Sequence, residues 1–288
     1  MKSIYLHEVS SAFTGFSAYV FGAFLLLFGG IYTLAYNLDL HVAEFQYVLQ
    51  NMSFLFIFII PVVTMRVWAE ERRQKTEQLL YALPLTMTQV VMGKYLALLT
   101  QLAVPVGLLG LYPLALSAYG NVPLGAAYSA LCGFFFLGAA LLAMGLLISC
   151  LTESQAAAAG LCFVVMLLNY FLVSLAELVP GTAAASLAAF GAVSLAMGGI
   201  LYGMTKNGVF SAVVSMLLLA ANLGVYAWKP SVYEGLFASV IRQMSLFSRF
   251  TVFVTGVFDW TAIVYDVTVI GAVLVFAIQI LEKRRWSE

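Results

Sequence analysis

Long apolar runs, each of about 18 to 25 residues and separated by short polar breaks, most limit what this chain can fold into. Of its 288 residues, 63% are hydrophobic and 9% charged, and the mean hydropathy is +1.01. A soluble protein of this size would need more polar side chains to cover its surface. Within a bilayer, a helix satisfies its own backbone hydrogen bonds, and about 20 residues suffice to cross. The sequence therefore predicts an all-α, polytopic membrane protein.

About eight of these runs are long enough to cross a membrane, and together they predict a single transmembrane domain over residues 1–288. The predicted spans are residues 18–36, 51–69, 95–118, 125–151, 156–178, 183–204, 209–228 and 260–281. Only Lys206 and Asn207 divide the sixth from the seventh, so a re-entrant pair is the alternative there. Pro61, Pro105 and Pro113 interrupt the second and third spans, where a missing backbone N–H can kink a helix.

Lysine and arginine are distributed unevenly between the two sides of this predicted bundle. One side carries Lys2, Arg66, Arg72, Arg73, Lys75, Lys94, Lys206, Lys283, Arg284 and Arg285, and the other carries Lys229, Arg242 and Arg249. Because basic loops favour the cytoplasm, we predict a multi-pass protein of the cell membrane with both termini cytoplasmic. Residues 1–17 then form a cytoplasmic segment, residues 70–94 a cytoplasmic loop and residues 229–259 an extracytoplasmic loop.

Motifs for catalysis, metal binding and nucleotide binding are missing from the sequence. The pair Gly93-Lys94 lacks the preceding glycine of a phosphate-binding loop. His7 and His41 fall on opposite sides of the predicted membrane and cannot share one metal site. The cysteines at 132, 150 and 162 lie in apolar runs without metal-ligand spacing, and zero formal net charge argues against nucleic acid as a partner. We expect no catalytic residue, metal or cofactor in this chain, which is not predicted to be an enzyme.

Charged residues inside the predicted spans are rare: Arg66, Glu177 and Asp266. Each lies near an end of its span, so snorkelling or capping at the interface is the expected role. A carrier coupled to protons or sodium ions usually has more charge within the membrane. This scarcity indicates that the driving force enters through a loop outside the bilayer.

The dense block of charge between the second and third spans is residues 70–77, EERRQKTE. Helix formers dominate from 73 to 83, where Leu79, Leu80 and Leu83 share one face, and Pro84 ends the segment. This pattern predicts a short amphipathic helix in the loop. A solvated connector whose charges only follow the topology rule is the alternative.

Residues 71–84, ERRQKTEQLLYALP, and residues 90–97, VVMGKYLA, resemble the signature of ABC-2 type permeases. Shared features are the acidic and basic residues, a Leu-Leu pair, a proline and a later Gly-Lys. Residues 13–20 and 245–250 are similar to the gliding-motility and nitrous-oxide-reductase-maturation branch of that family. The chain departs from the family pattern at Lys75, Gln78 and Arg249, and its predicted spans outnumber those of the basic fold.

This resemblance implies the membrane permease subunit of an ATP-driven transporter, more an exporter than an importer. ATP and magnesium would bind to a separate cytoplasmic ABC ATPase, and the permease would pair with a second copy or a paralogue in the lipid membrane. The residues implied to contact the ATPase, through a coupling helix, are Glu70, Glu71, Arg72, Arg73, Thr76, Glu77, Leu79, Leu80, Leu83 and Pro84. The alternatives are a stand-alone secondary carrier or channel, and a membrane scaffold for the assembly of another complex.

The predicted outer loop, residues 229–259, is not hydrophilic. Leu236, Phe237, Val240, Ile241 and Met244 recur at helical spacing, with Arg242 and Gln243 off that face. This spacing predicts a helix that lies in the outer membrane interface. Such a helix could gate an exit or cover the bundle.

Overall fold

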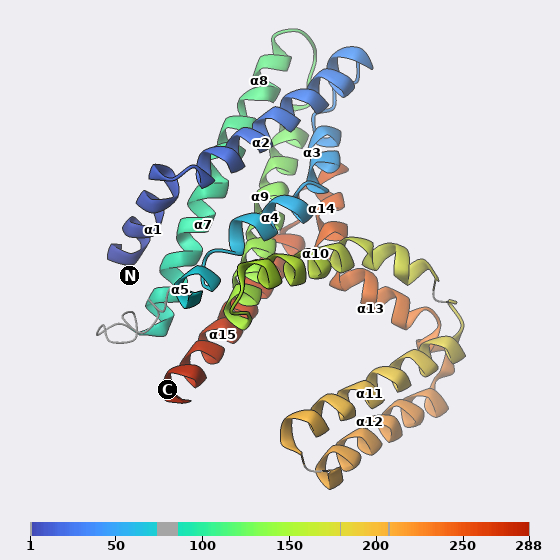
Figure 1. Cartoon of the computed structure of the whole chain (residues 1–288). Coiled ribbons are helices and arrows are strands. Elements are labelled where there is room, and N and C mark those ends of the chain that lie inside the picture. Colours follow the sequence, from blue (N-terminus) through green and yellow to red (C-terminus); the bar gives the residue numbers. More distant parts are fainter. Residues whose placement is uncertain (1, 74–85, 179, 207, 288) are drawn as a thin grey trace. The chain divides into compact units, whose positions relative to one another are not determined.

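The computed structural model describes residues 2–73, 86–178, 180–206 and 208–287, and these residues form helices joined by short turns (Figure 1). No strand occurs in these ranges, which confirms the all-α fold class. By contacts the chain divides into two compact units: unit 1 is Met1–Tyr170 with Leu246–Glu288, and unit 2 is Phe171–Ser245. Each unit is described separately below.

Seven described helices are long and apolar enough to cross a membrane, and a bent helix pair makes a possible eighth span. The seven are Ser17–Asp39, Met87–Ser117, Leu124–Leu151, Gln155–Leu178, Ala183–Gly203, Gly208–Trp228 and Trp260–Arg285, and the bent pair is Gln46–Ser53 with Phe56–Arg73. The predicted polytopic membrane protein is therefore confirmed.

Unit 1 contains the N-terminal helices and the C-terminal helix. Its elements are α1 (Lys2–Thr14), α2 (Ser17–Thr33), the π-helical η1 (Leu34–Asp39), α3 (Gln46–Ser53), α4 (Phe56–Thr64), α5 (Ala69–Arg73), α7 (Met87–Leu109), α8 (Leu111–Ser117), α9 (Leu124–Leu151), the first part of α10 (Gln155–Leu178), α14 (Leu246–Val254) and α15 (Trp260–Ser287). The start of α1, α5 and the end of α15 lie at one end of the unit, and the end of α8 lies at the other (Figure 1).

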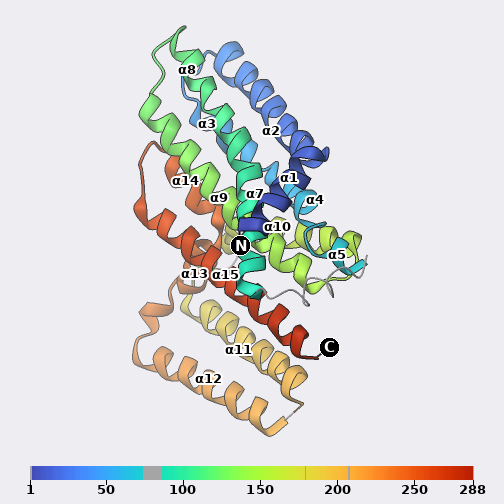
Figure 2. The same ribbon diagram turned by 90° about the vertical axis from the view of Figure 1, so that its left-hand side faces the viewer.

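Helix α9 is the centre of unit 1 and packs against α4, α7, α14 and α15 (Figures 1 and 2). Of its most apolar 18-residue window, 72% is buried, the largest share of any candidate span. Its glycines let neighbouring helices approach closely. A Cβ atom on Gly133 would lie 2.5 Å from the Phe253 ring, and one on Gly138 would lie 2.8 Å from Leu102. Small residues on α9 therefore fix how its neighbours dock.

The predicted second span, residues 51–69, is broken at residues 54 and 55, where no proline or glycine indicates a break. Helices α3 and α4 meet at a bend of 57° around Phe54 and Leu55. Around this bend the backbone N–H groups of Ile57 and Phe58 bond to carbonyls three residues back, at 3.2 Å and 3.1 Å, as in a tightened turn. Pro61 lies inside α4, beyond the bend. The kink expected at this proline is thus found one to two turns earlier in the chain.

The third span begins earlier than predicted. Helix α7 starts at Met87, and the Thr86 hydroxyl caps it by accepting a hydrogen bond of 3.3 Å from the Gln89 backbone N–H. Residues 87–94, expected in the loop, are therefore the first turns of α7. Pro105 lies within α7, and the chain continues past Gly110 into α8.

Unit 2 contains the end of α10, α11 (Ala183–Thr205), α12 (Gly208–Trp228), the 3₁₀ turn η2 (Pro230–Tyr233) and α13 (Leu236–Met244). Helices α11 and α12 form a hairpin in which the Ser211 hydroxyl donates to the Gly198 carbonyl. The helix predicted over 236–244 is present as α13. Its Phe237 ring packs edge-on against Phe190 of α11, with ring centroids 5.2 Å apart.

The second half of the predicted outer loop forms another helix, α14, which the sequence analysis did not predict. Its apolar side chains are buried against α9 and α3 of unit 1; they are Leu246, Phe247, Phe250, Phe253 and Val254. After α14, Asp259 starts α15 by accepting hydrogen bonds from the Thr261 hydroxyl and, at 2.8 Å, from the Thr261 backbone N–H. These hydrogen bonds lower the pKa of the Asp259 carboxyl.

Candidate functional site

Part of the predicted coupling segment lies in the described residues. Glu70, Glu71, Arg72 and Arg73 form most of the short helix α5. The other predicted contact residues, Thr76, Glu77, Leu79, Leu80, Leu83 and Pro84, and with them the predicted amphipathic helix, lie outside the described residues. Helix α5 lies at the same end of unit 1 as the start of α1 and the end of α15 (Figure 1).

A buried lysine connects α5 to two other helices. Lys94 of α7 is 2% exposed, and its ammonium group donates to Glu71 Oε1 at 2.6 Å, to Glu8 Oε1 at 2.8 Å and to the Val67 carbonyl at 3.1 Å. Its Nζ also lies 5.0 Å from the centroid of the Trp68 ring. All three ammonium protons thus have acceptors, as a buried charge requires. We call Lys94 with Glu8 and Glu71 the Lys94 junction.

Close packing of α1 on α7 brings Glu8 to this junction. A Cβ atom on Gly93 would lie 3.1 Å from Ile4 Cγ2, so the glycine leaves room for α1. About two turns further along α7, the hydroxyl groups of Tyr5 and Thr100 are hydrogen-bonded at 3.0 Å. The Gly-Lys pair of the sequence signature therefore has two structural roles. Gly93 lets α1 pack closely on α7, and Lys94 forms an ion pair with Glu8 of α1.

Helix α5 is also attached to the end of α9. Arg72 is 8% exposed, and its guanidinium donates to the Thr152 carbonyl at 3.2 Å. The Ser149 hydroxyl accepts from the backbone N–H groups of Trp68, at 3.1 Å, and Ala69, at 3.4 Å. Of the four predicted contact residues in α5, Arg73 is exposed whereas Arg72 is buried within unit 1.

A cavity of about 690 Å³ lies beside the Lys94 junction, between α1, α2, α4 and α7. We call it the α1–α7 cavity. Its charged lining residues are Glu8, Arg66, Glu70 and Lys94; its polar ones include Ser11, Ser17 and Gln101; its apolar ones include Val20, Phe21, Phe24, Phe58, Val62 and Leu98. The Arg66 side chain is exposed.

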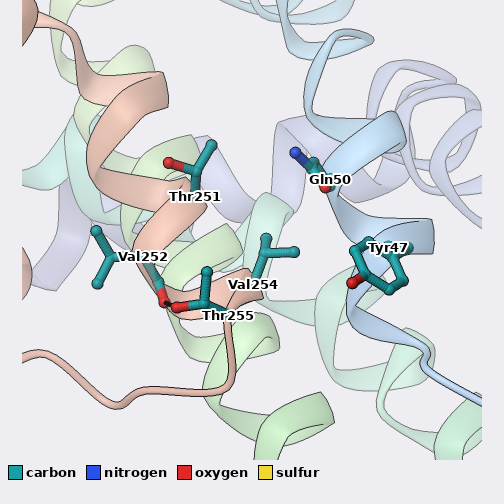
Figure 3. A pocket seen from close by; sticks show the side chains of 6 residues that line it. All are labelled: Tyr47, Gln50, Thr251, Val252, Val254 and Thr255. Atoms are coloured by element: carbon teal, nitrogen blue, oxygen red, sulfur yellow. Dashed lines mark hydrogen bonds between the residues drawn. The ribbon is translucent and has the colours of Figure 1, made fainter.

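A second cavity, of about 350 Å³, lies between α3 and α14 (Figure 3). Tyr47 and Gln50 of α3 face it from one side. Thr251, Val252, Val254 and Thr255 line it from α14 and the turn that follows. Its lining is neutral, with hydroxyl and amide groups but no charged side chain.

Asp266 is buried by the surrounding helices, whereas a side chain that snorkels to the membrane surface, as expected from the sequence, would be exposed. It is 3% exposed within α15, where it interacts electrostatically with Arg249 of α14. The Arg249 guanidinium lies 4.9 Å from the centroid of the Tyr265 ring. Helix α15 packs against α9, α7 and α14, and within this packing the Asp266 side chain is buried. Glu177, by contrast, is 66% exposed and lies 4.0 Å from Arg242.

The sequence analysis missed the Lys94 junction because its members come from three separate segments. Glu8 was not assigned a role, and Lys94 was counted as a loop residue. The signal that could have identified Lys94 is its position after Gly93 at the start of an apolar helix, where a charge needs a partner. In the described part of the chain, no group of three or more His, Cys, Asp or Glu side chains could hold a metal ion.

Comparison with known proteins gives one family match. The family model described as "ABC-2 family transporter protein" matches residues 4–286, a range that includes nearly all of both units. No curated protein matches the chain.

Proposed function

Because the chain belongs to the ABC-2 transporter family as a membrane permease component, we propose that it is the permease subunit of an ATP-driven exporter. ATP and magnesium bind to a separate cytoplasmic ATPase subunit, and the permease works with a second copy or a paralogue. Both termini and the segment 70–94 face the cytoplasm. Within the family, residues 13–20 and 245–250 favour the gliding-motility and nitrous-oxide-reductase-maturation branch.

The observation that carries this proposal is the Lys94 junction. Helix α5 leads directly into the predicted coupling helix, and the junction fastens α5 to α1 and α7 through charge-assisted hydrogen bonds of 2.6 Å and 2.8 Å. Ser149 and the Thr152 carbonyl fasten the same segment to α9. A displacement of the loop by an ATPase would therefore move α7 and α9, because each is bonded to α5 or to the turn before it. It would also move α1, because Glu8 of α1 is bonded to Lys94 of α7.

The second predicted span contains a bend that can act as the hinge for such a movement. The bend at Phe54 and Leu55 separates α3 from α4 by 57°. Bends of this kind act as hinges when the helices on either side move as rigid bodies. Tilting of α4 and α7 relative to α3 is thus the motion that we assign to the transport cycle.

An ion-coupled carrier that works without an ATPase is the second candidate, and Asp266 is the observation that favours it. A buried carboxylate in a membrane helix is by default a candidate ion or proton site. Substrate export that persists in vesicles lacking the ATPase, and that is abolished by Asp266→Asn, would support this carrier over the exporter.

The coupling proposal is tested by replacing both Leu79 and Leu80 with Asp. Two buried anchors worth about 2 kcal/mol each would, on removal, weaken binding to the ATPase by about a thousandfold. The measurement is copurification of the ATPase in mild detergent, together with substrate export. The matched control replaces Leu40 and Tyr119 with Asp, because these side chains are 64% and 89% exposed at the opposite end of unit 1. If the Leu79/Leu80 variant is expressed normally and retains its ATPase, residues 70–94 are only a connector.

A further inference from the structure

The lining of the α1–α7 cavity changes from charged to apolar along its length. Glu8, Arg66, Glu70 and Lys94 line it near α5, whereas phenylalanine and aliphatic side chains of α2 and α4 line the rest. We propose that this cavity binds one zwitterionic phospholipid-type amphiphile, with the head group at the charged end and the chain among the phenylalanines. This proposal is independent of the ATPase and of the direction of transport.

Arg66 is the basic group that the cavity offers to a phosphate. The ammonium group of Lys94 already donates hydrogen bonds to Glu8, Glu71 and the Val67 carbonyl, so none of its protons is left for a phosphate. Arg66, in contrast, is exposed and makes no ion pair within 4.0 Å among the described residues. A planar guanidinium matches a phosphate through two parallel hydrogen bonds. The phosphate of the head group is therefore assigned to Arg66.

The acidic residues of the same lining favour a head group that also carries a positive charge. Glu8 and Glu70 line the charged end together with Arg66 and Lys94, so the lining carries equal numbers of acidic and basic groups. Because the formal charges of this lining sum to zero, a purely anionic head would give the occupied cavity a net negative charge. A zwitterionic head, with an ammonium group next to its phosphate, leaves the occupied cavity neutral.

Gln101 provides an independent sign of a ligand deeper in the cavity. Its side chain lines the cavity and is 5% exposed, yet its amide nitrogen has no hydrogen-bond partner within the described residues. Leaving a buried donor unsatisfied costs about 1–3 kcal/mol. Gln101 lies two turns, or about 10 Å, along α7 from Lys94. In a glycerophospholipid an ester carbonyl follows the phosphate toward the chain, and this carbonyl is a suitable acceptor.

The apolar part of the cavity is accessible from the lipid side. Val20 and Phe24 of α2, and Phe58 and Val62 of α4, line the cavity and are between 37% and 60% exposed. A chain could therefore enter sideways between α2 and α4 while the head remains at the charged end. The volume of about 690 Å³ lies within the range of about 300–1,000 Å³ that is usual for ligand sites.

The chain position is tested by photo-crosslinking of the full-length protein in an uncharged maltoside detergent. The probe is a lysophosphatidylethanolamine with a diazirine in its acyl chain. We expect saturable labelling of peptides that contain residues 20–24 or 58–63, reduced at least fivefold by Val62→Trp, which fills the cavity. Val104→Trp is the matched control, because Val104 is 46% exposed on α7 and does not line the cavity. Labelling that is not saturable, or that Val62→Trp leaves unchanged, would overturn the proposal.

The head-group assignment is tested with competing ligands. Unlabelled lysophosphatidylethanolamine should compete about tenfold better than monoacylglycerol, which lacks the phosphate, and better than lysophosphatidic acid, which lacks the ammonium group. Arg66→Gln should remove the advantage over monoacylglycerol. Gln101→Leu should weaken competition by all three ligands, because each has an ester carbonyl, and Lys2→Gln should have neither effect. Equal competition by all three ligands would refute head-group recognition. Because no ATPase is present, these outcomes do not depend on whether the coupling proposal holds.

Discussion

Lys94 shows how a single charge can organise one end of a membrane protein. A buried ammonium group is costly to remove from water, and it is retained only where acceptors surround it. Here the acceptors come from α1, from α5 and from the backbone of the turn between α4 and α5. The Trp68 ring adds a favourable interaction with the cation. One side chain thereby holds together the segments next to the predicted coupling helix.

Lys94→Met is expected to lower the stability of the purified protein. Removing one partner of a buried ion pair costs about 3–5 kcal/mol, and the cost here should be smaller because Glu8 and Glu71 are 28% and 22% exposed. Thermal unfolding in detergent, followed by tryptophan fluorescence, measures the change. Adding Glu8→Gln and Glu71→Gln to the Lys94→Met variant should recover part of the loss, since it removes the uncompensated carboxylates. Lys2→Met is the control for loss of a surface charge. An unchanged midpoint for Lys94→Met would show that the junction contributes nothing to the fold.

At the scale of elements, the turn between α4 and α5 shows how a break in a membrane helix can keep its backbone N–H groups hydrogen-bonded. Backbone N–H groups that lose their helical acceptors need other partners in lipid. The Ser149 hydroxyl of α9 accepts from two such groups, those of Trp68 and Ala69. The side chain of one helix thus stabilises the irregular backbone of another. This arrangement also determines where α5 begins.

Ser149→Ala is therefore expected to destabilise the protein, whereas Ser129→Ala should not. Both serines are buried on α9, but the Ser129 hydroxyl has no hydrogen-bond partner among the described residues. The Ser149 substitution leaves two backbone donors without their acceptor, at a cost of about 1–2 kcal/mol. Comparing the detergent unfolding midpoints of the two variants measures this difference. Equal midpoints would mean that the Ser149 hydrogen bonds are replaced by others or contribute nothing.

At the scale of the whole molecule, the elements next to the predicted coupling segment gather at one end of unit 1. Helix α5 bonds to the end of α9 through Arg72 and Thr152, and Arg284 near the end of α15 donates to the Leu151 carbonyl at 3.4 Å. The connection between α8 and α9 lies at the opposite end (Figure 1). The two ends of the chain and α5 therefore lie at the same end of unit 1 (Figure 1).

The predicted orientation can be measured with single cysteines after the native cysteines 132, 150 and 162 have been replaced. Because basic loops face the cytoplasm, cysteines at Glu44 and Glu234 should react with an impermeant thiol reagent in intact cells. Cysteines at Gln74 and Lys206 should react only after lysis. Reaction at Gln74 in intact cells would reverse the orientation. Reaction at Lys206 in intact cells would mean that α11 and α12 do not cross as a pair.

Several features of the structure could be predicted from the sequence because they depend on local composition. The apolar runs specify membrane helices, since a span must satisfy its own backbone whatever surrounds it. The spacing of Leu236, Phe237 and Ile241 specifies α13 in the same way. Family membership also follows from the linear sequence, and the match over residues 4–286 agrees with the resemblance of residues 71–97.

The candidate site depended on contacts that sequence spacing does not determine. Lys94 meets Glu8 and Glu71 across 86 and 23 residues, and only the packing of α1 and α5 on α7 brings these carboxylates together. The same packing encloses the α1–α7 cavity and buries Gln101. The packing of α15 likewise buries Asp266, for which an exposed, snorkelling side chain was expected. The sequence by itself thus determined which segments enter the membrane, because hydropathy is a property of each segment alone. Only the tertiary structure decided which charges are buried and paired, because burial and pairing depend on which segments pack against one another.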